Sequence, residues 1–122
     1  MTNATPTTEE KLTLLVESGT IASATMTSVL GLMPDLDERF SGGFDEGLGQ
    51  MLLVHLAMAV ERVRRGEDIE HSEALDGVSG EALQRARLLL ARLSATIGID
   101  IGSQAEIAYV AAYLEAIEGE SR

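Results

Sequence analysis

Residues 51–65 read MLLVHLAMAVERVRR, and this stretch decides the fold class of the chain. Its apolar residues recur at helical spacing, which predicts a helix from about Asp45 to Arg65. Almost every position from Met51 to Val60 is apolar, so we expect this helix to be central, with neighbours on several sides. The apolar stripe predicted to face those neighbours consists of Leu48, Met51, Leu52, His55, Leu56, Ala59 and Val63.

Two capping boxes mark the starts of other helices. In a capping box, a Ser or Thr side chain accepts from a backbone N–H three residues on, and a Glu there reaches back. Thr7 and Glu10 have this spacing and predict a first helix over residues 8–18. Ser103 and Glu106 have it too, directly before an apolar periodic run, and predict a last helix. We therefore expect Glu106 to serve as the capping partner of Ser103.

The remaining helices have weaker signals. Apolar residues over 21–33 predict a second helix, which Gly31 and Pro34 are expected to end. Residues 35–47 contain several glycines and are predicted to be a loop with at most a short helical turn. Ser79 can cap a helix over 80–97, and the last helix is expected to end near Gly119.

The composition supports the same fold class. Of the 122 residues 45% are hydrophobic, but only 3% are aromatic, so the core must be built from aliphatic side chains, which suit helices better than strands. We predict an all-α fold, a compact bundle of about five helices. Residues 1–7 are expected to form a flexible N-terminal tail, and residues 8–119 a single helical domain.

Charge and cysteine content narrow the classes of function. The formal net charge of −11 repels phosphates, so direct binding to nucleic acid or to an anionic membrane is not expected. The chain contains no cysteine, which excludes disulfides and thiolate sites. The N-terminus lacks the layout of a signal peptide, and the longest apolar stretch is too short to span a bilayer. We expect a cytoplasmic protein.

Two histidines are the candidates for chemistry, His55 on the central helix and His71 in an acidic connection. A neutral imidazole can attack phosphorus, and a guanidinium can hold phosphoryl oxygens. Arg62 lies seven residues after His55, two turns away on the same helix face, with the small Ala59 between them. The alternative for His55 is a half-buried core histidine that is hydrogen-bonded to the backbone or to a carboxylate. His71 is expected at the surface, and no metal, cofactor or catalytic motif is predicted.

Two stretches resemble the signatures of the PTS-regulation domain, or PRD. Residues 54–62 (VHLAMAVER), followed by Gly66 and Glu67, are similar to the first signature, in which His-Leu opens a helix that ends in Glu-Arg. Residues 106–111 (EIAYVA) are similar to the second, an acidic residue followed by an apolar helix. The resemblance extends over roughly residues 8–118.

The PRD resemblance implies a fold and a function. Such domains are helical bundles that usually form homodimers, and they occur mostly in bacterial transcription antiterminators and activators. Phosphocarrier proteins of the sugar phosphotransferase system phosphorylate their histidines. By this resemblance His55 matches the first phosphoacceptor and Arg62 the arginine that follows it. The second histidine position holds Tyr113, Val54 replaces a common acidic residue, and no nucleic-acid-binding domain is attached, so the chain resembles a stand-alone PRD with a degenerate second motif.

The resemblance and the composition lead to one main hypothesis and two alternatives. The main hypothesis is a regulatory domain, not an enzyme, that is phosphorylated on His55 and controls transcription or a partner. The first alternative is a constitutive interaction or dimerisation module without phosphorylation. The second is a small helical enzyme that binds a carboxylate through Arg62 and its neighbours, which is disfavoured because adjacent arginines at a helix end fan outward. Whichever hypothesis holds, Tyr109 and Tyr113 share a helix face and are expected to be packing residues with solvated hydroxyls.

Overall fold

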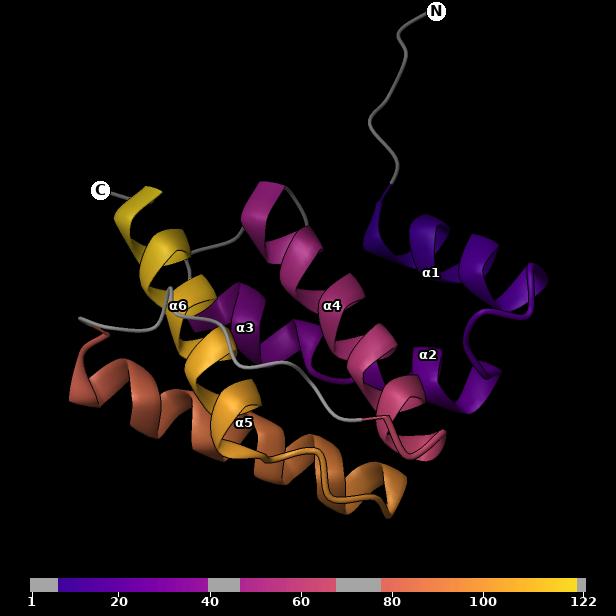
Figure 1. Ribbon diagram of the computed structural model, residues 1–122. Helices are drawn as coiled ribbons and strands as arrows, with labels where there is room; N and C mark the ends of the chain where they lie inside the picture. The colour runs from indigo at the N-terminus through magenta and orange to yellow at the C-terminus, as the bar shows by residue number, and fades with distance from the viewer. Residues whose placement is uncertain (1–6, 40–46, 68–77, 121–122) are drawn as a thin grey trace, which may run out of the picture.

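The computed structural model describes residues 7–39, 47–67 and 78–120, and within these ranges it contains six α-helices and no strand. This confirms the predicted all-α fold. The helices are α1 (Thr8–Glu17), α2 (Ser23–Leu30), α3 (Met33–Arg39), α4 (Gly47–Arg64), α5 (Gly80–Ile97) and α6 (Gln104–Glu120). Helix α4 packs against α1 and α2 on one side and α6 on the other, as Figure 1 shows. The helix predicted to be central is therefore central.

The first helix begins at the predicted capping box. The Thr7 hydroxyl accepts from the Glu10 N–H at 3.1 Å, and the Glu10 carboxylate accepts from the Thr7 N–H at 3.0 Å. These two bonds satisfy donors that a helix N-terminus otherwise leaves unpaired. On the inner face of α1, Leu12 is fully buried.

The segment after α2 differs from the prediction, because Pro34 belongs to a third helix instead of ending the second. Helix α2 ends at Leu30, and α3 begins at Met33, so Pro34 lies in the first turn of α3. Proline is tolerated there because the N–H that it lacks would have no intrahelical partner. Leu36 buries the inner side of α3, which supplies the packing that a short helix needs. The predicted loop is thus helical as far as Arg39, and residues 40–46 lie outside the described part.

Helix α2 begins at a residue that cannot cap it. Its N-cap is Ala22, which makes no side-chain capping bond. Glu61, near the end of α4, supplies the missing acceptor: its Oε2 accepts from the Ala22 N–H at 3.0 Å and its Oε1 from the Thr25 hydroxyl at 3.3 Å. A carboxylate at a helix N-terminus also complements the helix dipole. Glu61 therefore ties the start of α2 to α4.

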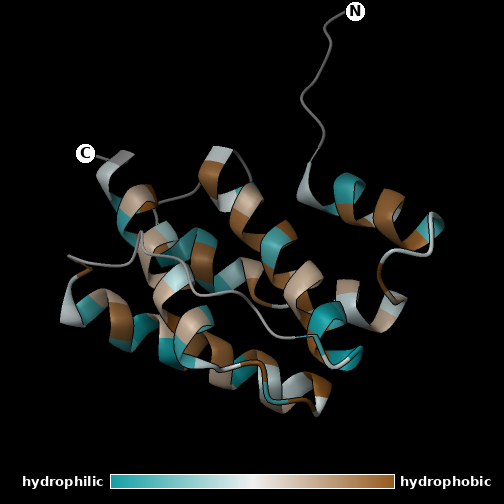
Figure 2. Cartoon of the chain, viewed as in Figure 1, coloured by the Kyte–Doolittle hydropathy of each residue, from teal (hydrophilic) through white to brown (hydrophobic). Residues whose placement is uncertain are grey.

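The buried surface of α4 is broader than the predicted stripe and is rotated relative to it. Leu52 and Leu56 are fully buried, as predicted, but Met51 is 53% exposed. Leu53 and Ala57, which lie beside the stripe, are fully buried instead. A helix with neighbours on two sides must bury more than one face, so the stripe alone could not locate Met51 correctly. In Figure 2 the C-terminal end of α4 is hydrophilic.

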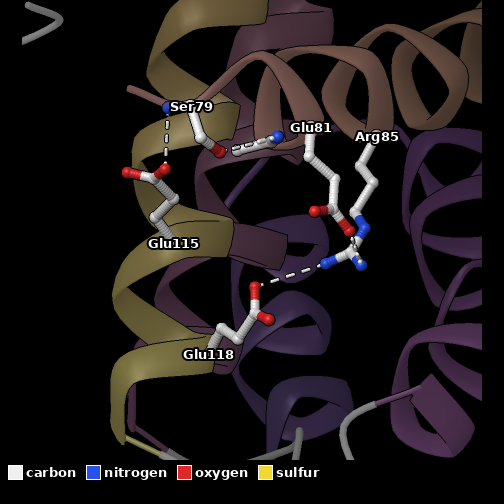
Figure 3. A network of polar contacts seen from close by, with 6 residues as sticks. Ser79, Glu81, Arg85, Glu115 and Glu118 are labelled. Carbon is white, nitrogen blue, oxygen red and sulfur yellow. Dashed lines mark hydrogen bonds and ion pairs between the residues drawn. The ribbon is translucent and has the colours of Figure 1, made fainter. Parts of the chain in front are cut away.

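Helices α5 and α6 form the most extensive pair of the bundle. Helix α5 has the predicted limits, because Ser79 caps its first turn and Gly98 ends it in the left-handed conformation with φ +74°. Polar contacts join its N-terminus to α6 (Figure 3). The Ser79 N–H donates to the Glu115 carboxylate at 2.7 Å, and Arg85 bonds to both Glu81 and Glu118.

The polar contacts between α5 and α6 add to the apolar packing of this pair. Hydrogen bonds from Ser79 to the Glu115 carboxylate lower the pKa of Glu115 below its usual value. Exposed ion pairs such as those of Arg85 contribute about 0–1 kcal/mol each. Apolar packing therefore supplies most of the stability of this pair. Among the described helices, none is both long and apolar enough to cross a membrane.

Candidate functional site

His55 lies on α4 where that helix packs against α6. Its imidazole side chain is 16% exposed, so it is neither a surface residue nor sealed in the core. The preceding residue, Val54, is half-buried, and the following residue, Leu56, is fully buried. Because a helix turns 100° per residue, Leu56 anchors the core face while His55 reaches its edge.

Glu106 is the direct partner of His55. Its carboxylate Oε1 lies 2.6 Å from Nε2 of His55, and the residue is completely buried in the first turn of α6. Burial of a charged group is costly unless it is paired, and the imidazole provides the pairing. The two residues are 51 positions apart in the sequence. The packing of α6 on α4 therefore creates the pair.

The predicted capping role of Glu106 is only half right. The Ser103 hydroxyl accepts from the Glu106 N–H at 3.1 Å, as a capping box requires. The Glu106 side chain, however, turns toward His55, and its Oε2 has no hydrogen-bond partner among the described residues. The Glu106 carboxylate takes this orientation because it is buried where α6 packs on α4, and the imidazole lies beside it there.

Two tyrosines from α6 cover the imidazole. The Tyr109 ring stacks on His55 with the ring centroids 4.2 Å apart and the planes 14° from parallel. Tyr113 lies further along, 6.2 Å from His55 and 5.3 Å from Tyr109. Glu106, Tyr109 and Tyr113 are separated by three and four residues, so they share one face of α6. That face forms one wall of the candidate site.

The Tyr113 hydroxyl remains protonated at neutral pH. Burial raises the pKa of Tyr113 above its usual value near 10.0, and the neighbouring Tyr109 hydroxyl raises it further. A protonated phenol can donate a hydrogen bond to an anionic oxygen. The two tyrosines, expected as packing residues, lie beside the imidazole with their rings.

Arg62 lies at the exposed end of the same helix. It is exposed, and within the described residues no ion pair involves it, whereas Arg64 pairs with Glu61 and Arg65 with Glu67. Seven residues of helical rise separate it from His55 by about 10 Å along the axis. The small side chain of Ala59, between the two, is covered by other residues and is only 1% exposed. The Arg62 guanidinium therefore does not adjoin the imidazole directly.

His71 lies outside the described residues, so its predicted surface position stays a prediction. In the described part of the chain no group of three or more His, Asp or Glu residues could hold a metal ion.

The acidic partner of the imidazole was the main omission of the sequence-based reasoning. The sequence allows a half-buried histidine bonded to a carboxylate, but its capping pattern predicts that Glu106 pairs with Ser103 instead. The available signal was the spacing of Glu106, Tyr109 and Tyr113, which places an acid on the tyrosine face of the last helix. Nothing in the local sequence says that this face meets His55.

Comparison with known proteins gives one finding. A family model described as the PRD domain matches residues 31–117 of the 122-residue chain. The match includes α3 to α6 without the last residues of α6, and with it all of the candidate site. No curated protein and no solved structure shows significant similarity to the chain.

Proposed function

Because this chain belongs to the PRD family, whose members are regulatory and not catalytic domains, we propose that it receives a phosphoryl group on His55. The donor would be a phosphocarrier protein of the sugar phosphotransferase system. The phosphoryl group would change how the domain contacts a partner or controls transcription. We also propose that the protein is cytoplasmic, because these phosphocarrier proteins act in the cytoplasm.

One observation carries the proposal: the imidazole of His55 is partly exposed and is held at one edge by a buried carboxylate. A nucleophilic histidine needs both access for the donor and a fixed ring orientation. The 16% exposure supplies the first, and the 2.6 Å bond to Glu106 supplies the second. A core histidine serving only in packing would need no exposed edge.

Phosphorylation would strain the contact between α4 and α6. A phosphoryl group adds a charge of about −1.5 to −2. At about 7 Å from the Glu106 carboxylate and an effective dielectric constant of about 20, each added unit of charge costs about 2 kcal/mol. A cost of this size is enough to shift a two-state equilibrium more than tenfold. We propose that the packing of α6 on α4 is the element that responds.

Arg62 is proposed to receive the phosphoryl oxygens. Its guanidinium has no ion pair within the described residues, and it lies on the helix that carries His55. The long side chain must fold back toward His55 to make the contact, because about 10 Å of helix axis separates the two residues. Arg62 would then help to compensate the new negative charge.

Phosphoryl transfer from a radioactively labelled phosphocarrier tests the proposal. We expect the wild type and His71→Ala to be labelled, His55→Ala to stay unlabelled and Arg62→Ala to be labelled more slowly. Circular dichroism must show that each variant is folded. Equal labelling of the wild type and His55→Ala, or no labelling of either, would refute the proposal.

A homodimer is proposed as the assembly on which the phosphoryl group acts. The family usually forms homodimers, and Met51 and Leu88 leave apolar surface exposed on α4 and α5. Light scattering should report a mass near twice 13.0 kDa. A monomer that persists at high protein concentration would contradict this assembly.

A second candidate function is a constitutive interaction module, and Tyr113 favours it. This residue occupies the position of the second phosphorylated histidine in the family pattern and cannot accept a phosphoryl group in the same way. If phosphorylation were lost altogether, wild type and His55→Gln would capture the same partners with equal yield. Loss of partners only on phosphorylation would support the regulatory function instead.

A further inference from the structure

We infer that Glu106 holds His55 in the tautomer protonated on Nε2, so that Nδ1 is the atom that accepts the phosphoryl group. The second half of the inference depends on the proposed function. The first half concerns the unmodified protein and can be measured without any donor. Glu106 acts here as a positioning residue, because it contacts the imidazole and not the incoming group.

The partner at Nε2 is an acceptor. A carboxylate offers only lone pairs, so the 2.6 Å contact between Nε2 and Oε1 of Glu106 fits an imidazole that donates its Nε2 proton to Glu106. Glu106 is completely buried, and its Oε2 has no hydrogen-bond partner among the described residues. The imidazole N–H is therefore the one hydrogen-bond donor that the described structure gives this carboxylate, which favours the Nε2–H tautomer.

Among the described residues, none bonds to the other ring nitrogen. Nδ1 of His55 makes no hydrogen bond to the described residues, and it is not one of the buried atoms that lack a partner. Tyr109 covers one face of the ring at 4.2 Å. The nucleophilic lone pair of a neutral imidazole lies in the ring plane, on the nitrogen without a proton. Reaction at Nδ1 therefore requires no break in the contact with Glu106.

Phosphoryl transfer to Nδ1 can proceed while the proton stays on Nε2 of His55. The Nδ1 lone pair forms the new bond to phosphorus, and the phosphorus–nitrogen bond of the donor breaks. The electron pair of that bond stays with the donor nitrogen. The Nε2 proton remains shared between the ring and Glu106, so the hydrogen bond to the buried carboxylate persists during the transfer. Attack through Nε2 would instead require this proton to leave and the buried carboxylate to lose its partner.

The tautomer is tested first, by nitrogen-15 NMR of the protein labelled in its histidines. The His71→Gln background leaves His55 as the sole histidine. At about pH 8, where an ordinary histidine is neutral, we expect Nε2 to have the shift of a protonated ring nitrogen and Nδ1 that of an unprotonated one. The opposite pattern, with the proton on Nδ1, would overturn the inference whether or not the protein is ever phosphorylated.

The role of Glu106 is tested by two matched variants. Glu106→Gln keeps the shape but removes the charge, and Glu61→Gln does the same to another buried glutamate that lies away from the imidazole. We expect Glu106→Gln to alter the nitrogen shifts of His55 and to slow labelling about 10- to 100-fold, as when the carboxylate partner of a metal-binding imidazole is removed. Glu61→Gln should change neither. Unchanged shifts and rate in Glu106→Gln would overturn the positioning role.

The site of attachment is read from the phosphorylated protein. Phosphoramidate serves as a small donor with a phosphorus–nitrogen bond, beside the phosphocarrier, and correlated phosphorus and nitrogen NMR identifies the bonded ring atom. We expect Nδ1 with either donor. Attachment to Nε2 would overturn the inference while leaving the proposed function intact. Attachment to Nδ1 from phosphoramidate with no transfer from the phosphocarrier would support the inference and count against the proposed function.

Discussion

Replacing His55 by alanine should destabilise the fold through Glu106 more than through lost packing. Glu106 is completely buried, and its carboxylate depends on the imidazole for its hydrogen bond. Removing one member of a buried pair costs about 3–5 kcal/mol because the other charge is left uncompensated. The imidazole is 16% exposed, so water can enter the space that it leaves. We therefore expect the lower end, a loss of about 3 kcal/mol in the free energy of unfolding.

A loss of this size is easily measured. Domains of this length have unfolding free energies of about 5–15 kcal/mol, so His55→Ala should remain folded but be much less stable than the wild type. If the free energy of unfolding decreases by about 2 kcal/mol per M of urea, the urea concentration at the unfolding midpoint should fall by about 1.5 M. The chain contains no tryptophan, so far-ultraviolet circular dichroism is the appropriate probe.

A double-mutant cycle separates the pair from its surroundings. Wild type, His55→Ala, Glu106→Gln and the double variant are unfolded in urea under the same conditions. Because the neutral side chain of Glu106→Gln has no charge to compensate, we expect the double variant to be more stable than the sum predicts, by at least about 1.5 kcal/mol. If the two single effects add to within about 0.5 kcal/mol, the residues are not coupled and the reasoning about this pair is wrong.

Three further predictions concern the fold. Glu61→Ala removes the carboxylate that accepts from the Ala22 N–H and should cost about 1–3 kcal/mol in urea unfolding, whereas Glu61→Gln should cost less. Folding lowers the pKa of Glu115 below its value near 4.5 in the unfolded chain. The stabilisation from Glu115 is therefore present above pH 4.5 and is lost as the pH falls through the pKa of the folded state. Glu115→Gln should make the free energy of unfolding less dependent on pH in this acidic range. Leu56→Ala should cost about 2–5 kcal/mol because it opens a cavity in the core, whereas Met51→Ala, at a position 53% exposed, should change the midpoint little.

The sequence predicted the helices with strong local signals. Helix α5 has the predicted limits because Ser79 and Gly98 determine its two ends through their own backbone and side-chain preferences. The capping box of Thr7 and Glu10 likewise acts within four residues. Pro34 misled the prediction because proline both ends helices and begins them, and the burial of Leu36 decides between the two.

The candidate site was predictable only in part, because its residues meet through tertiary packing. His55 was identified from its position on an apolar helix and from the family pattern. Its pairing with Glu106 depends on the angle and register of α6 against α4, which no local pattern encodes. Met51 illustrates the same limit, since the sequence places it on the apolar stripe and the orientation of α4 leaves it outside.

The dependence of α2 on Glu61 has a consequence for how the chain folds. The Ala22 amide finds its acceptor 39 residues further along the chain. An eight-residue helix does not persist by itself in water, so α2 should consolidate only after α4 has docked beside it. The order of assembly would then run against the order of synthesis at this point, with an early segment waiting for a later one. Native-state hydrogen exchange would report this as protection at Ala22 that is lost only when α4 also opens.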